Sequence, residues 1–175
     1  LASNLGEMVK ELKILAPDVP QYVLTNATLL GNKTVQKNLE NVDKVIIKLD
    51  AGTEKTFQIV NRPADGVTLE STLSGIKDFR KTYSGMVEVQ SMFMPLNIIE
   101  LEEYAAFLKE INPDIVQLNT PKRPYPTSWH RENRGNHLGL HDHKTTMLKT
   151  VSIEEAKELE EKLRELTKLE IVSIY

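Results

Sequence analysis

The sequence contains no cysteine, which excludes disulfides, thiolate metal sites and cysteine nucleophiles within these 175 residues. No apolar run approaches the roughly 20 residues that a membrane-spanning helix needs. The first residues lack the basic and apolar regions of a signal peptide, so we expect a cytoplasmic protein with no membrane partner. The net charge is only −3, which gives no broad electrostatic reason to bind nucleic acid or anionic lipid.

The remaining composition is that of a folded domain. Apolar residues make up 40% of the chain and charged residues 27%, a balance that excludes a disordered tail. A chain of this length suits one domain and buries about two-thirds of its unfolded surface.

Apolar periodicity predicts helices that alternate with strands. Helical spacing is found over residues 5–15, 35–39, 54–60, 69–83 and 98–111, and buried strands are expected at 21–26, 44–50, 86–94 and 114–119. Strands separated by helices form parallel βαβ units. We therefore expect an α/β fold with mainly parallel strands, either an open doubly wound sheet or part of a βα (TIM-like) barrel.

The last third of the chain is less regular. Residues 122–146 have no steady apolar period, and residues 147–151 resemble a short strand. Ser152 and Glu155 form a capping box for a helix that ends near Leu166, and residues 170–175 resemble a terminal strand. We expect a barrel part over residues 1–130, followed over 131–175 by a histidine-rich loop and a strand–helix–strand appendage beside the barrel.

Polar residues follow or end four of the predicted strands. The carboxyl ends of parallel strands meet at one edge, which is where such folds bind ligands. A single polar residue at a strand end more often caps a turn, but four such ends in one chain favour a ligand site. The candidate residues at these ends are Asn26, Lys48, Asp50, Gln90, Gln117 and Asn119.

Charged residues at three positions have both a structural and a functional interpretation. Lys48 and Asp50 are two residues apart in a strand and therefore point to the same side. They form either a structural ion pair or a ligand clamp in which Asp50 accepts hydrogen bonds from hydroxyls. Arg62 precedes Pro63, which favours extended backbone at Arg62. Its guanidinium is either solvated or presents a planar fork to a carboxylate or phosphate.

A series of short motifs resembles radical S-adenosylmethionine proteins, most closely iron–sulfur oxidoreductases related to the wyosine-forming tRNA enzymes. The resemblance covers about residues 1–130. The motifs are Leu24-Thr25-Asn26-Ala27, Lys48-Leu49-Asp50-Ala51, Asn61-Arg62-Pro63, and Gln117-Leu118-Asn119-Thr120-Pro121 with Arg123-Pro124 after it. The family's cluster motif CxxxCxxC and its GGEP-like motif are absent, and Leu1-Ala2-Ser3-Asn4 resembles the family segment directly after the GGEP-like motif. The resemblance therefore implies the carboxyl-terminal part of a partial βα barrel.

The resemblance also implies a cofactor, a cluster and residue roles. The full-length parent would bind S-adenosylmethionine and a [4Fe–4S] cluster and cleave the cofactor reductively. The chain alone would be inactive because it lacks the cluster cysteines, and no catalytic residue is assigned in it. Lys48 and Asp50 would approach the ribose and methionine, and Arg62 the methionine carboxylate. The residues implied to line the cavity or face the substrate or adenine are Asn26, Gln90, Gln117 and Asn119.

A cluster of histidines supports an alternative function. Imidazoles and carboxylates are good zinc or iron ligands, but the spacing here matches no established motif, which favours a solvated loop over a metal site. The residues concerned are His130, His137, His141, Asp142 and His143, of which His137, His141 and His143 are the weak metal-ligand candidates. The alternative function is a cysteine-free βα-barrel module that binds a small molecule or a metal.

Two kinds of partner are also considered. Basic and aromatic residues between 122 and 134 stack on bases and neutralise phosphates in RNA-binding proteins, so they suggest contact with tRNA, or else a solvated loop. A barrel fragment without its first strands exposes a sheet edge, so we also expect self-association.

Overall fold

The computed structural model describes residues 3–120, 124–126, 145–147 and 149–174. The chain begins with α1 (Leu5–Leu15), β1 (Tyr22–Thr25), α2 (Lys33–Leu39) and β2 (Lys44–Lys48). A short helical segment follows, made of α3 (Glu54–Thr56) and the π-helical η1 (Phe57–Asn61). The remaining elements are α4 (Leu69–Thr82), β3 (Met86–Met92), η2 (Ile98–Glu100), α5 (Leu101–Ile111), β4 (Ile115–Asn119), β5 (Pro124–Pro126), β6 (Thr145–Met147), α6 (Ile153–Thr167) and β7 (Ile171–Ile174).

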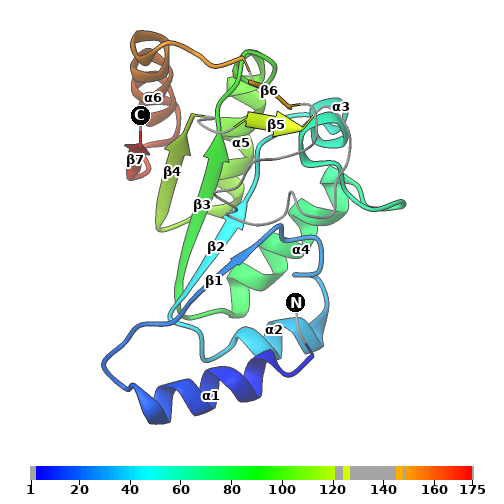
Figure 1. Cartoon of the computed structure of the whole chain (residues 1–175), viewed down its shortest axis with the longest axis vertical. Coiled ribbons are helices and arrows are strands. Elements are labelled where there is room, and N and C mark those ends of the chain that lie inside the picture. The colour runs from blue at the N-terminus through cyan, green and yellow to red at the C-terminus, as the bar shows by residue number, and fades with distance from the viewer. Residues whose placement is uncertain (1–2, 121–123, 127–144, 148, 175) are drawn as a thin grey trace.

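The main sheet has five strands in the order β1-β2-β3-β4-β7, and every neighbouring pair is parallel. Figure 1 shows the sheet in front and α4 and α5 behind it. The expected α/β class with mainly parallel strands is therefore confirmed.

Local sequence signals set several helix starts. Thr68 and Ser152 each accept a hydrogen bond from the backbone three residues on, and both helices have complete capping boxes. Asn32 caps α2 in a similar way. Asn4, in contrast, precedes α1 without a side-chain cap. The caps place α2, α4 and α6 where the periodicity predicts them.

The two faces of the sheet differ in chemistry. Strand residues on one face are buried against the helices, and together they form the core: Val45, Ile47, Val87, Val89, Val116, Leu118 and Ile171. Alternate residues point to the opposite face, which we call the open face. Several of its apolar side chains are exposed, namely Tyr22, Leu24, Met86, Val172 and Ile174. The open face also carries most of the candidate polar residues.

The C-terminal elements differ from two expectations. The strand expected at 147–151 is wrong: β6 ends at Met147, and residues 149–152 form neither helix nor strand. β6 instead pairs antiparallel with β5. The terminal strand is not part of a separate appendage. β7 pairs parallel with β4 and so becomes the fifth strand of the main sheet. The expected division at residue 130 falls outside the described residues and stays a prediction.

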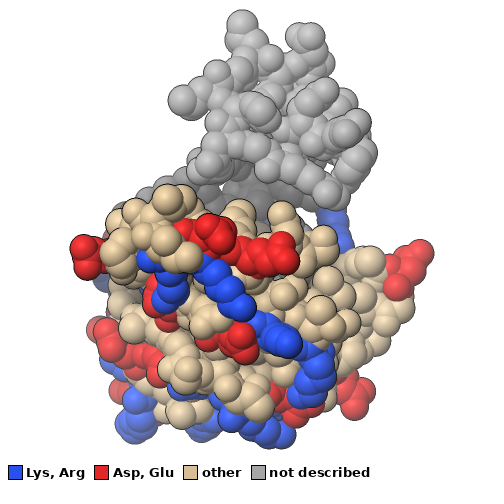
Figure 2. All heavy atoms as spheres, turned by 90° about the horizontal axis from the view of Figure 1, so that it is seen from below, with Lys and Arg blue, Asp and Glu red and all other residues tan. Residues whose placement is uncertain are grey.

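The surface charges are mixed in sign. Figure 2 shows Lys and Arg interspersed with Asp and Glu on the face seen from below. In the described part of the chain, no helix is both long and apolar enough to cross a membrane.

Candidate functional site

The structure brings the carboxyl ends of the strands to one edge, as a parallel sheet requires. Lys48 pairs with Gln90, Gln90 with Gln117, and Met92 with Asn119, so these positions form two adjacent rows across the sheet. We call this part of the molecule the carboxyl edge. Asn26 and Asp50 follow β1 and β2 at the same edge.

Asp50 is the most connected of the candidates. Its side chain accepts hydrogen bonds from Lys48, from Met92 N at 2.6 Å and from Asn61 Nδ2 at 3.2 Å. The residue is only 7% exposed, whereas the Lys48 side chain is 26% exposed. The buried carboxylate thus has the cationic partner that a buried charge needs, and the ammonium of Lys48 is held at the open face.

The strands β2 and β3 separate at the carboxyl edge, and side chains replace the backbone ladder there. The last backbone bond between them runs from Leu49 N to Gln90 O at 3.1 Å. Beyond it, Asn97 Nδ2 donates to Asp50 O at 2.7 Å and to Met92 O at 2.8 Å. Asp50 Oδ1 accepts from Met92 N. Asp50 and Asn97 therefore span the gap between the two strand ends.

Three amides form a chain across β3 and β4 on the open face. Gln90 Nε2 donates to Gln117 Oε1 at 3.2 Å, and Gln117 Nε2 donates to Asn119 Oδ1 at 3.2 Å. All three residues are half-buried. The chain of amides is uncharged and begins beside Lys48, because Lys48 and Gln90 are register partners.

Asn26 and Arg62 differ from the other candidates. The Asn26 side chain accepts from Thr28 N at 3.3 Å and from its hydroxyl at 3.1 Å, which is an Asx turn. Arg62 is not extended, so that expectation is wrong: its φ is 46° and its ψ 60°, in the left-handed region. The physical reason is that Arg62 ends η1, where a left-handed residue commonly stops a helix.

Glu100 anchors the loop after β2. Its carboxylate accepts from Gly52 N at 3.0 Å, Thr53 N at 3.1 Å, Thr53 Oγ1 at 2.7 Å and Thr56 Oγ1 at 2.5 Å. Partial burial raises the pKa of Glu100, but the bonds from Thr56, Thr53 and Gly52 outweigh it and hold the pKa below its usual value. A side chain at Gly52 would meet Glu100 O at 2.7 Å, so this contact requires glycine.

Sequence reasoning missed Asn97 and Glu100, and it named Asn61 only as part of a motif. Asn97 lies in a loop before the apolar spacing at 98–111 begins, and Glu100 is a polar position within that spacing, so the periodicity marks neither side chain as a contact of the β2 end. The available signal was the proximity of Asn97 to the end of β3, directly after Pro95 and Leu96.

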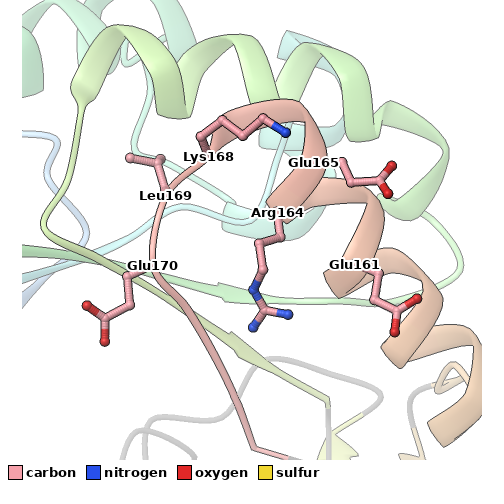
Figure 3. Close-up of a pocket in the computed structure, with 6 residues that line it drawn as sticks. All are labelled: Glu161, Arg164, Glu165, Lys168, Leu169 and Glu170. Atoms are coloured by element: carbon pink, nitrogen blue, oxygen red, sulfur yellow. The ribbon is translucent and has the colours of Figure 1, made fainter.

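Two surface pockets in the described part of the chain lie away from the candidates. One is lined by residues of the α6 end and the start of β7, and Figure 3 shows their side chains: Glu161, Arg164, Glu165, Lys168, Leu169 and Glu170. Another lies at the C-terminal ends of α4 and α5. Both are at the opposite edge of the sheet from Asp50.

The candidate metal ligands His130, His137, His141 and His143 lie outside the described residues. Over residues 3–120 and the shorter described stretches, no group of three or more His, Asp or Glu side chains is arranged to hold a metal ion. Metal binding by the histidines therefore stays a prediction.

The residues at the carboxyl edge fit one of the two implied groups. S-adenosylmethionine carries a carboxylate, an amino group, hydroxyls and a sulfonium, and this edge offers a cation, a carboxylate and amides. The [4Fe–4S] cluster is held in proteins by cysteine thiolates. Since the chain has no cysteine, its residues do not fit the cluster.

Comparison with curated sequences finds relatives in several organisms. A UPF0026 protein of Synechocystis is 38% identical over 166 residues, covering 93% of this chain and 62% of that protein. A UPF0026 protein of Methanocaldococcus jannaschii is 36% identical over 125 residues, covering 69% of this chain and 38% of that protein. The chain thus spans less than two thirds of these relatives. No protein-family model matches it.

Comparison with solved structures shows the fold. SuiB of Streptococcus suis, in a crystal structure bound to S-adenosylmethionine, aligns with a TM-score of 0.68 at 13% identity, covering 97% of this chain and 36% of SuiB. A domain of pyruvate-formate lyase-activating enzyme from Bacteroides vulgatus aligns with a TM-score of 0.63 at 16% identity, covering 98% of this chain and 92% of that domain. The chain therefore has an α/β fold shared with these proteins.

Proposed function

We propose that these residues belong to a radical S-adenosylmethionine enzyme and bind S-adenosylmethionine on the open face at the carboxyl edge. The observation that carries the proposal is the convergence of Lys48, Asp50, Gln90, Gln117 and Asn119 at that edge. The fold shared with SuiB, which binds this ligand, supports it. The motif series that resembles the family supports it independently.

The charges of the ligand match the charges at the edge. In the proposal, Lys48 and Arg62 attract the methionine carboxylate, and Asp50 offsets the sulfonium or accepts a ribose hydroxyl. A carboxylate has about four lone-pair sites. Three of those on Asp50 are used by Lys48, Met92 N and Asn61, so about one is left for a hydroxyl.

The uncharged residues have complementary roles. Gln90, Gln117 and Asn119 face the substrate or the adenine, and amides suit such groups because they both donate and accept. Asn26 lines the proposed ligand site at the end of β1. Its side chain is exposed, and its bonds to Thr28 fix its orientation.

The reaction class proposed for the intact protein is reductive cleavage of S-adenosylmethionine by a [4Fe–4S] cluster. This chain offers no cysteine and so would supply no thiolate ligand to that cluster, and in the proposal the chain alone is inactive. A closer relation to the wyosine-forming enzymes, and with it contact with tRNA, stays a prediction. So does self-association through the free edge of β1.

The binding proposal is tested by titration calorimetry of S-adenosylmethionine with the intact protein. Lys48→Met should weaken binding by about tenfold, equivalent to ~1.4 kcal/mol. The control is Lys44→Met combined with Glu88→Gln. Lys44 lies on the same strand and face, and it pairs with Glu88 at 2.7 Å towards the opposite edge.

The control variant should bind with unchanged affinity because Lys44 and Glu88 lie nearer the amino ends of β2 and β3, away from the carboxyl edge. If the control loses as much affinity as Lys48→Met, binding is not located at the carboxyl edge. If Lys48→Met binds normally, Lys48 does not contact the ligand.

A further inference from the structure

Asn97 is buried beside the candidate site, and its side-chain amide donates to the backbone carbonyls of Asp50 and Met92. We propose that Asn97 is a positioning residue, which sets the separation of the β2 and β3 ends and thereby the placement of Asp50 and Lys48. The residue is 5% exposed, so it does not itself face a ligand in solution. The binding part of this inference rests on the proposed function.

The hydrogen bonds of Asn97 are the first argument. Its Nδ2 donates to Asp50 O and Met92 O, and its Oδ1 accepts from Met94 N at 2.8 Å. One planar amide thus joins the end of β2, the end of β3 and the following loop. Asparagine is required because aspartate lacks the donor and alanine lacks both functions.

The position of the gap is the second argument. Met92 N and Met92 O lie beyond the last ladder bond, and both are satisfied by side chains, from Asp50 and Asn97 respectively. Without Asn97, two carbonyls at the rim would lose their partners, and unpaired buried carbonyls are unfavourable. The strand ends would then shift to regain hydrogen bonds, and the Asp50 carboxylate would shift with them.

The turn that carries Asn97 is fixed independently. Glu100, three residues on, holds Gly52 and Thr53 through its carboxylate. Tyr104 adds a bond from its hydroxyl to Leu49 O at 3.4 Å. These bonds hold the segment from Asn97 to Tyr104 in place behind the end of β2. Asn97 can therefore fix the position of the strand ends that it contacts.

Hydrogen exchange of the intact protein without ligand tests the positioning. Asn97→Ala should speed exchange of the Met92 amide by at least tenfold relative to the Val87 amide. Asp114→Ala is the matched control, because it removes the Asp114 Oδ2 that accepts from Val87 N at 2.7 Å at the other end of β3. The control should show the reverse ratio. Equal exchange ratios in Asn97→Ala and the wild type would overturn the proposal.

Calorimetric titration with S-adenosylmethionine tests the consequence for the site. Asn97→Ala and Asn97→Asp should both weaken binding by about tenfold, and Asp114→Asn should not. Combined with Asp50→Asn, Asn97→Ala should add little further loss, because both act on the same carboxylate. Full additivity, or normal affinity in Asn97→Ala, would overturn the proposal.

The two measurements separate this inference from the proposed function. If the wild type does not bind S-adenosylmethionine, the proposed function fails. The exchange ratio of Met92 and Val87 still decides whether Asn97 sets the gap between the strands.

Discussion

Replacing Asp50 by asparagine separates the charge of the site from its shape. The new amide keeps an oxygen for Met92 N, which lies 2.6 Å from Asp50 Oδ1 in the native protein. Its NH₂ group would face Asn61 Nδ2, but Asn61 Oδ1 is buried without a hydrogen-bond partner. Rotation of the Asn61 amide by half a turn restores a donor–acceptor pair. Asp50→Asn should therefore fold normally.

Asp50→Asn should lower the free energy of unfolding mainly because the negative charge of the side chain is removed. A hydrogen bond to a charged group contributes about 1.5–3 kcal/mol and a neutral one about 1 kcal/mol. Lys48 keeps the retained oxygen as an acceptor but loses its negatively charged partner, and its side chain is 26% exposed and can be hydrated. We expect a loss of ~1–2 kcal/mol, which lowers Tm by about 2–8 °C in a protein of this size.

Asp50→Asn should also weaken the binding of S-adenosylmethionine, and the small loss of folding stability does not account for this effect because the variant remains folded. Loss of a charged hydrogen bond or of the sulfonium's counter-charge corresponds to about a ten- to hundredfold weaker Kd. Arg62→Lys should weaken binding too, because a point charge does not replace a bidentate fork. Calorimetry on the intact protein measures both.

A comparison with Asp114→Asn makes the result decisive. Asp114 is also a carboxylate that accepts from a β3 amide and pairs with an arginine, Arg80, but at the opposite edge. Its replacement should lower Tm and leave Kd unchanged. The reasoning is refuted if Asp50→Asn melts earlier yet binds normally, since Asp50 would then only hold the loop together.

Three further predictions concern the support of the site and the core. Gly52→Ala should destabilise the protein by about 1–3 kcal/mol, measured by urea unfolding, because the methyl group would meet Glu100 O at 2.7 Å; wild-type stability would contradict this close approach. Below pH 4.5, the usual pKa of Glu100, the unfolded chain binds more protons than the native state, so the stabilisation from Glu100 is present above that pH and lost as pH falls through the lowered pKa. A Tm series from pH 7 to 3 should thus fall less steeply in Glu100→Gln, and parallel curves would refute the assignment. Tyr83→Phe should lose about 1–3 kcal/mol because the hydroxyl donates to the buried Val42 O at 2.7 Å; its titration in the wild type should be displaced upward, since burial raises the pKa of Tyr83 to about 12.

The regular elements were predictable because their apolar spacing reflects one buried face. The strand expected at 44–50 is found at Lys44–Lys48, and the helix expected at 69–83 is found at Leu69–Thr82 with Thr68 as its cap. The strand ends two residues early because its last backbone bond to β3 is made by Leu49 N, after which the two strands separate. Strand order did not follow from the alternation, because a doubly wound sheet and a barrel part order their strands differently; the structure shows the sequential order β1-β2-β3-β4-β7.

The contacts within the site were not predictable to the same degree. The role of Asn97 becomes visible only in three dimensions, because its amide joins two strand ends that are far apart in the sequence. Its partners Asp50 and Met92 are separated by 42 residues. The left-handed backbone of Arg62 follows from the end of a π-helical turn, which sequence patterns do not reveal. The addition of β7 to the main sheet depends on α6 packing against the core through Leu163 rather than on the residues of β7 alone.

The central claim is that S-adenosylmethionine binds at the carboxyl edge on the open face. Backbone amide shifts of the isotope-labelled intact protein, recorded with and without the ligand, test it most directly. The account predicts changes at Lys48, Asp50, Met92 and Asn119 and none at Lys44, Met86 or Asp114 at the amino ends of the same strands. Changes confined to the amino ends, or no changes at saturating ligand, would contradict it.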